Sequence, residues 1–265
     1  MIKIVSWNIN SIRLRLVNLK MLVDQYKPDI LCLQETKVDN SQFPINEVRS
    51  MGFDFIEFDG EKSYNGVAIL SKMPLKNINK IDILNYQQKR HISASINISN
   101  QQVDLHNFYV PAGGDIPDVS INDKFDHKLK FIDWMSEYFN KNSQRQNIIL
   151  GDFNIAPSPF DVWSHRQLLN VVSHTQIEVD KLNNLQNKGN FVDCHRHFVE
   201  PDKKIYSWWS YRSLDPFKTN RGRRLDHIWI SNKLKENLID TKIFTEYRIA
   251  KLPSDHVPIS ITLGI

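Results

Sequence analysis

The chain is poor in the residues that mark secreted, zinc-binding or membrane proteins. It has two cysteines, Cys32 and Cys194, without C-x-x-C spacing, so neither a disulfide framework nor a cysteine zinc site is predicted. Cys32 lies in an apolar run and is expected to be a buried thiol. No stretch approaches the roughly 18 apolar residues of a membrane span, and the N-terminus lacks a signal-peptide core. These absences favour a soluble cytoplasmic protein with no membrane partner.

Three common catalytic motifs are also absent. The sequence has no G-x-S-x-G elbow of serine hydrolases, no P-loop lysine motif and no G-x-G-x-x-G dinucleotide fingerprint. Among its nine glycines, Gly113 and Gly114 are adjacent, and we interpret this pair as a turn rather than a phosphate cradle. Any catalytic chemistry must therefore come from other residue types.

The overall composition is that of an ordinary folded protein. Hydrophobic residues make up 41% and charged residues 24%, so disorder and coiled coil are not favoured. Lysine and arginine number 34 against 30 acidic residues, a formal charge of +4. This mild excess is compatible with a polyanionic partner but is also common in proteins that bind none. The length of 265 residues predicts one domain spanning residues 1–265, and we expect a monomer.

Apolar periodicity predicts strands interspersed with helices. Strands are expected over residues 1–8, 29–35, 53–58, 66–71, 91–98, 103–110, 147–150, 206–209, 225–230, 242–245 and 257–263. Helices are expected over residues 12–26, 125–139, 162–169 and 176–186. Because some strands are joined by short turns and others by helices, the pattern favours a mixed, layered α/β domain.

Polar residues gather at the ends of the apolar runs. They are Asn8, Glu35, Tyr109, Asp152, Asn154, Asp226, Asp255 and His256. Taken singly, each has an ordinary alternative as a turn, a cap or a structural ion pair. Together they offer carboxylate and amide oxygens and one imidazole, which suits magnesium or manganese better than structural zinc. With a positioned water, such a set can hydrolyse a phosphodiester.

Six motifs resemble the exonuclease III branch of the endonuclease–exonuclease–phosphatase superfamily, in the family's order and over nearly the whole chain. They are Ser6-Trp7-Asn8-Ile9-Asn10, Leu33-Gln34-Glu35-Thr36-Lys37, Tyr109-Val110-Pro111, Gly151-Asp152-Phe153-Asn154-Ile155-Ala156-Pro157, Arg224-Leu225-Asp226-His227 and Ser254-Asp255-His256. The resemblance implies a four-layer αββα sandwich with two mixed β-sheets and the active site at one edge. It also implies a DNA-repair hydrolase that cuts double-stranded DNA 5′ to abasic sites and removes 3′-blocking groups or nucleotides.

The resemblance further implies a role for each polar residue, with Mg²⁺ as cofactor and Mn²⁺ as a substitute. The implied metal-binding residues are Asn8, Glu35, Asp152, Asn154, Asp255 and His256. The implied catalytic residues are Tyr109, Asp152, Asn154, Asp226 and His256. Asp226 would orient the His256 imidazole beside the scissile phosphate, and Tyr109 would bind phosphate or assist the leaving group. Either Asp152 or His256 can take the water's proton; we favour Asp152, since a carboxylate beside a metal-bound water needs only a modest pKa change.

Five more residues are expected to contact DNA. Arg90 and Lys124 match basic positions of the family approximately. The resemblance also implies that Trp208 and Leu225 form the walls of a small apolar pocket, which admits a flipped sugar without its base. Arg223 stands where the animal branch has a tryptophan, so its stem would line the pocket while its head reaches a phosphate. On this basis Trp208→Ala should lower abasic-site incision more than it lowers removal of a 3′-phosphate.

Two other functions stay open at this point. One is another hydrolase of the same superfamily, acting on a phosphoinositide, a sphingolipid or unspecific duplex DNA. The motifs at residues 109–111 and 206–209 resemble the repair branch rather than the lipid phosphatases. The second is a non-catalytic binding module, which would have little reason to retain the full set of polar residues. The balance among abasic-site incision, 3′-phosphodiesterase and 3′-to-5′ exonuclease activity is not decided, because one phosphate-cleaving centre serves all three.

Overall fold

The computed structural model describes residues 1–98, 101–212 and 215–264. Within these ranges the strands form two six-stranded sheets and one two-stranded ribbon. Sheet A runs in the order β13 (Leu238–Ile243), β14 (Ile259–Leu263), β1 (Ile2–Asn8), β2 (Ile30–Gln34), β4 (Tyr64–Ser71) and β3 (Phe55–Glu61). Sheet B runs in the order β5 (Lys76–Asn79), β6 (His91–Ile98), β7 (Gln101–Tyr109), β8 (Asn147–Asp152), β12 (Asp226–Ser231) and β9 (Phe191–Asp193). The ribbon pairs β10 (Trp208–Trp209) with β11 (Gly222–Arg223).

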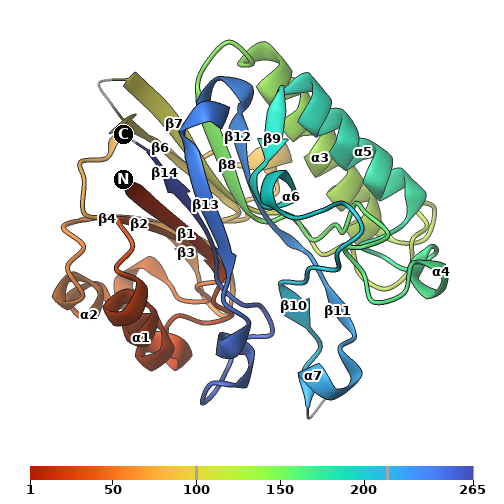
Figure 1. Cartoon of the computed structure of the whole chain (residues 1–265), viewed down its shortest axis with the longest axis horizontal. Helices are drawn as coiled ribbons and strands as arrows, with labels where there is room; N and C mark the ends of the chain where they lie inside the picture. Colours follow the sequence, from red (N-terminus) through yellow and green to blue (C-terminus); the bar gives the residue numbers. More distant parts are fainter. Residues whose placement is uncertain (99–100, 213–214, 265) are drawn as a thin grey trace.

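The two sheets pack face to face between two layers of helices (Figure 1). On the outer face of sheet A lie α1 (Leu16–Tyr26) and α2 (Ile45–Ser50), and on that of sheet B lie α3 (Asp123–Lys141) and α5 (Gln176–Lys188). Shorter helices are α4 (His165–Leu168), α6 (Cys194–Phe198) and α7 (Pro216–Thr219), with 3₁₀ turns at Arg13–Arg15, Asn40–Gln42, Ile83–Asn85, Asn232–Asn237 and Thr245–Ile249. This arrangement confirms the predicted αββα sandwich of two mixed sheets.

Burial on both faces explains the continuous apolar runs of the central strands. In β8, Ile148 and Leu150 pack into the core between the two sheets, while Ile149 between them packs against the helices over sheet B. Successive side chains of a strand point to opposite faces, so a strand covered on both sides needs apolar residues at every position. Within the described residues, no helix combines the length and apolar character needed to cross a membrane.

Strand direction brings the polar strand ends to one edge of the sandwich. β1 and β2 are parallel, as are β7 and β8, so each pair ends on one side. β12 runs antiparallel to β8, with Asp226 directly opposite Asp152. β14 runs antiparallel to β1, so the start of β14 lies beside the end of β1. The segment that precedes β14, with Asp255 and His256, therefore lies at the same edge. Residues far apart in the sequence therefore meet at a single edge.

Some predicted elements differ in extent from the observed ones. The helix expected over residues 162–169 is reduced to α4, because Val162 forms a β-bridge with Arg223 and the Trp163 amide donates to the Gly222 carbonyl. The strand expected over residues 242–245 is β13, which starts at Leu238 and pairs with β14. The short elements β5, β9, β11, α2, α6 and α7 were not predicted. They have too few residues for periodicity to reveal them.

Candidate active site

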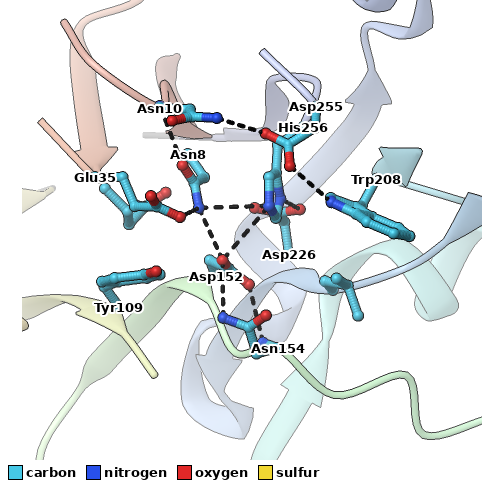
Figure 2. A network of polar contacts seen from close by, with 12 residues as sticks. Asn8, Asn10, Glu35, Tyr109, Asp152, Asn154, Trp208, Asp226, Asp255 and His256 are labelled. Carbon is cyan, nitrogen blue, oxygen red and sulfur yellow. Dashed lines mark hydrogen bonds and ion pairs between the residues drawn. The ribbon is translucent and has the colours of Figure 1, made fainter. Parts of the chain in front are cut away.

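Asn8, the last residue of β1, lies at the centre of the polar cluster (Figure 2). Its side-chain nitrogen Nδ2 donates to Oε1 of Glu35 and to Oδ2 of Asp152, both at 2.8 Å. The same nitrogen lies 3.4 Å from Nε2 of His256. Because Asn8 belongs to sheet A and Asp152 to sheet B, this buried amide joins the two sheets at their shared edge.

Asp152 ends β8 and is held by the residue two places further on. The backbone amide of Asn154 donates to Oδ1 of Asp152 at 2.9 Å, and its side-chain Nδ2 donates to Oδ2 at 3.0 Å. Gly151 is needed beside it, because at its φ of +132° a Cβ would lie 1.9 Å from the Phe108 carbonyl oxygen. Burial raises the pKa of Asp152 to about 7, with the charge of His256 opposing that shift and the charge of Asp226 adding to it.

His256 is buried between two carboxylates. Its Nδ1 lies 2.8 Å from Oδ2 of Asp226, and its Nε2 lies 3.6 Å from Oδ2 of Asp152. The Ser207 hydroxyl donates to the same Asp226 oxygen at 2.6 Å. Burial alone would lower the pKa of His256, but the charges of Asp226 and Asp152 raise it to about 10. The imidazole is therefore protonated at neutral pH.

Glu35 follows β2 with a φ of +52°, a left-handed conformation that is uncommon for a residue other than glycine. This turn directs its side chain toward Asn8, and Lys37 Nζ lies 2.6 Å from the second carboxylate oxygen. Tyr109 ends β7 with its hydroxyl directed toward the cluster (Figure 2). Burial, reinforced by the charge of Glu35, raises the pKa of Tyr109 well above its usual value, so its hydroxyl keeps its proton.

Asp255 is fixed through both of its carboxylate oxygens. Nδ2 of Asn10 donates to Oδ1 and the indole Nε1 of Trp208 donates to Oδ2, each at 3.0 Å. Burial acts to raise the pKa of Asp255, but the His256 charge and these two donors outweigh it and lower the pKa below its ordinary value. The carboxylate is therefore ionised at neutral pH.

A pocket of about 250 Å³ opens onto this cluster. Its lining residues include Glu35, Tyr109, Asp152, Asn154, Val172, Ser173, Trp208, Arg223, Leu225, Asp255 and His256. Nη1 of Arg223 donates to the Val172 carbonyl at 3.0 Å and to the Ser173 hydroxyl at 2.7 Å. The Arg223 guanidinium carbon lies 5.4 Å from the centre of the Trp208 ring. The pocket thus joins a polar wall to an aromatic and aliphatic one. A larger groove between α1 and α2 contains none of the predicted site residues.

Comparison with known proteins identifies the family. The model of the Endonuclease/Exonuclease/phosphatase family matches residues 5–256. The chain belongs to this family. Over 267 aligned residues it is 32% identical to exodeoxyribonuclease III of Haemophilus influenzae, covering 97% of this chain and 98% of the relative. It is 28% identical over 268 residues to the DNA-(apurinic or apyrimidinic site) endonuclease of Dictyostelium discoideum, covering 99% of this chain and 71% of the relative.

Solved structures of the family agree with this assignment. An AP endonuclease from Archaeoglobus fulgidus superposes with a TM-score of 0.91 at 32% identity, covering 100% of both chains. A 3′ phosphatase from Neisseria bound to a product DNA hairpin also gives 0.91, at 30% identity and 100% coverage of both chains. The predictions of family and fold are confirmed, as is that of a hydrolytic nuclease of the DNA-repair type.

The structure of this family member brings all eight polar strand-end residues predicted from the sequence together at the sheet edge (Figure 2). Trp208, Arg223 and Leu225 line the adjoining pocket. The two basic residues expected to contact DNA, Lys124 and Arg90, differ in exposure. Lys124 is exposed in the first turn of α3, whereas Arg90 is 7% exposed and its guanidinium carbon lies 4.6 Å from the centre of the Tyr109 ring. Their contacts with DNA stay predictions.

Three site residues were within quoted motifs without receiving a role. Lys37 pairs with Glu35, Asn10 holds Asp255, and Ser207 holds Asp226. The sequence could have pointed to Lys37 and Asn10 because each lies two positions from a candidate site residue, and to Ser207 because it precedes Trp208. Each is a neutral or basic donor to a carboxylate, so each limits the repulsion among the acidic groups of the site.

Lys128 is a buried residue that contacts two of the loops lining the pocket. No motif or pattern in the sequence pointed to it. Its Nζ lies 2.5 Å from Oε1 of Glu178, and both side chains are fully buried. The same ammonium donates to the carbonyl oxygens of Asn154 at 2.8 Å and Ala112 at 3.2 Å. Glu178 in turn accepts from the Ser173 amide at 2.9 Å. This one ion pair therefore connects α3 and α5 to two loops that line the pocket.

The donor chemistry of the cluster fits a hard divalent cation. Asp152, Asp226 and His256 place one possible ligand atom each within 4.8 Å of one another. Asp226 accepts from His256 Nδ1 and does not line the pocket, whereas Glu35, Asp152 and Asp255 do, so these three carboxylates face the space that a cation would enter. Magnesium is usually bound in proteins by one or two carboxylates, with waters and substrate phosphate completing its shell. Neither cysteine of the chain is among the residues that line the pocket.

Proposed function

We propose that this chain is a magnesium-dependent repair nuclease that incises double-stranded DNA 5′ to abasic sites and removes 3′-blocking groups or nucleotides. One observation carries the proposal: the carboxylates and the imidazole of the cluster line the same small, partly apolar pocket as Trp208 and Leu225. Pockets for drug-sized ligands measure about 300–1,000 Å³, so a pocket of about 250 Å³ suits a smaller group. A flipped sugar without a base is such a group, and flipping costs least where base pairing is already lost.

In this proposal, each part of a phosphodiester hydrolysis is assigned to a residue of the cluster. Asp152 accepts the proton of the attacking water, because His256 is already protonated and Asn154 fixes the Asp152 carboxylate. His256, oriented by Asp226, neutralises charge on the scissile phosphate. The hydroxyl of Tyr109 is protonated and donates a hydrogen bond to the leaving oxygen.

Glu35 and Asp152 would hold Mg²⁺ or Mn²⁺, and Asn8, Asn154, Asp255 and His256 would complete the surrounding polar shell. When bound, the ion would polarise the phosphate and neutralise negative charge that develops on it. Lys37 Nζ lies 2.6 Å from Oε2 of Glu35, so its positive charge offsets part of the negative charge of the acidic cluster.

The relatives support both halves of the proposal. The Archaeoglobus structure is named an AP endonuclease, while the Neisseria protein is named a 3′ phosphatase and was solved with a DNA hairpin. The Haemophilus relative is named exodeoxyribonuclease III. We also propose that the chain acts in the cytoplasm as a single-domain monomer, which light scattering during size-exclusion chromatography would test for its oligomeric state.

Matched oligonucleotide duplexes test the function directly. One carries a central abasic site, a second ends in a 3′-phosphate, and a third is an undamaged duplex with a recessed 3′-hydroxyl end. We expect cleavage 5′ to the abasic site and release of the 3′-phosphate, with both reactions abolished by EDTA and restored by excess Mg²⁺ or Mn²⁺. A phosphoinositide serves as the competing substrate. Hydrolysis of the lipid without cleavage of any duplex would overturn the proposal.

A further inference from the structure

Trp208 lies between the wall of the pocket and the catalytic cluster. Its backbone pairs with Arg223 in the two-stranded ribbon and forms a β-bridge with His256. The amide of the next residue, Trp209, donates to the Asp255 carbonyl at 2.9 Å. The backbone of this segment is thus bonded to the catalytic loop before β14 as well as to the pocket strand β11.

The Trp208 side chain, like its backbone, contacts both the pocket and the loop that carries Asp255. Its ring packs against the apolar cluster that contains Leu225 and lines the pocket. Its indole N–H points the other way and donates to Oδ2 of Asp255 at 3.0 Å (Figure 2). An indole nitrogen can only donate, so this bond requires the acceptor oxygen that the Asp255 carboxylate presents.

The remaining oxygen of Asp255 accepts from Asn10, a residue of the loop after β1. A carboxylate with one donor on each oxygen, from two separate segments, has a single favoured orientation. Removing either donor takes away one of these two side-chain hydrogen bonds and loosens the orientation of the carboxylate. Hydrogen bonds to charged groups are among the stronger ones in proteins.

We propose that Trp208 is a positioning residue for Asp255 in addition to a wall of the pocket. The identity of the pocket's ligand rests on the proposed function, but the positioning role does not, because Asp255 belongs to the centre that all substrates share. Loss of the indole N–H therefore slows every reaction of the centre, whereas loss of the ring surface affects only the substrate that places a sugar in the pocket.

Trp208→Phe separates these two roles, since phenylalanine keeps an aromatic wall and removes the N–H. We expect kcat to fall roughly tenfold on both the abasic and the 3′-phosphate duplex, with each KM within about twofold of the wild type. Trp163→Phe is the matched control. Trp163 packs against the same apolar cluster, and within the described residues no hydrogen bond joins it to Asp255, so this variant should keep wild-type kcat.

A double-mutant cycle and a spectroscopic signal complete the test. In an Asp255→Asn background, Trp208→Phe should lower kcat further by less than about twofold, because the two changes remove one contact. In metal-free wild-type protein, the Trp208 indole ¹⁵N–¹H resonance is identified by its loss in Trp208→Phe. It should move on Asp255→Asn substitution, while that of Trp163 should not. Asn10→Ala removes the other donor to Asp255, together with the Oδ1 that accepts from Lys37 Nζ at 2.6 Å, and should also lower kcat on both substrates. This second variant keeps the test available if Trp208→Phe does not fold.

Unchanged kcat on both substrates in Trp208→Phe or in Asn10→Ala would overturn the positioning role. So would an unmoved indole resonance, or an undiminished effect of Trp208→Phe in the Asp255→Asn background. The proposed function fails separately. A wild-type protein that releases 3′-phosphate but does not cut the abasic duplex would refute abasic-site incision, while the effect of Trp208→Phe on 3′-phosphate release would still decide the inference.

Discussion

Nδ1 of His256 lies 2.8 Å from Oδ2 of Asp226, and this buried contact sets the charge of the imidazole. Burial opposes protonation, but the two neighbouring carboxylates raise the pKa of His256 from 6.5 to about 10. Because the folded-state pKa is above the unfolded one, protonated His256 contributes stability that is fully present below about pH 6.5. That contribution is lost as the pH rises through about 10.

Asp226→Asn is expected to lower the pKa of His256, because an amide cannot supply the charge that stabilises imidazolium. The measurement is an NMR titration of the His256 ring protons in metal-free protein. Wild-type His256 should stay protonated through pH 8, while in the variant it should lose its proton at lower pH. Asp240→Asn, at an exposed carboxylate on β13, is the control and should leave the titration unchanged. An unaltered His256 titration in Asp226→Asn would contradict the assigned contact.

Glu35→Ala and Asp152→Ala are each expected to lower kcat about 100-fold or more in saturating Mg²⁺. The first removes a proposed cation ligand, and the second removes a proposed ligand that is also the proposed base. Circular dichroism should show folded protein in both cases. Glu57→Ala is the matched control, since Glu57 lies on the edge strand β3 with its side chain 37% exposed. Near wild-type turnover of either site variant would rule out the metal-centred assignment.

Lys124→Ala is expected to weaken DNA binding and to reduce its salt dependence. Loss of one phosphate contact should make the slope of log K against log salt concentration shallower by about 0.9. Lys141→Ala is the control, because Lys141 is also exposed on α3 but lies roughly 25 Å from Lys124 at 1.5 Å per residue. If both variants give the wild-type slope in a fluorescence anisotropy titration, Lys124 is outside the DNA footprint.

Lys128→Met is expected to destabilise the protein by about 3–5 kcal/mol, because it removes the ammonium partner of the fully buried Glu178 carboxylate. The double variant Lys128→Met/Glu178→Leu should recover part of that loss. Lys181→Met is the matched control. Lys181 and Asp133 also form an ion pair between α3 and α5, but this pair lies at the surface. Its loss should cost less than about 1 kcal/mol in urea unfolding. Equal costs for the two lysines would mean that burial adds nothing to the Lys128 pair.

The residues of the polar cluster could be predicted because each follows or precedes an apolar strand within a recognisable motif. Asp152 directly ends the apolar run of β8, and His256 comes just before β14. The predicted helix at residues 162–169 was too long because β11 competes for the backbone of Val162 and Trp163. Such a long-range pairing leaves no local pattern in the sequence. The burial of Lys128 leaves none either, because it depends on an ion pair with Glu178 on another helix.

The sequence by itself determined the chemical character of the site and the family to which the chain belongs. Ligand type, strand ends and motif order are local properties of the chain, so a reader of the sequence can list them. The tertiary structure alone decided which of these groups touch. Asn8 and Asp152 are 144 positions apart, and the 2.8 Å between them depends on the register of two sheets. The bond from Trp208 to Asp255 and the ion pair of Lys128 with Glu178 arise in the same way, since contact distances follow from packing rather than from residue order.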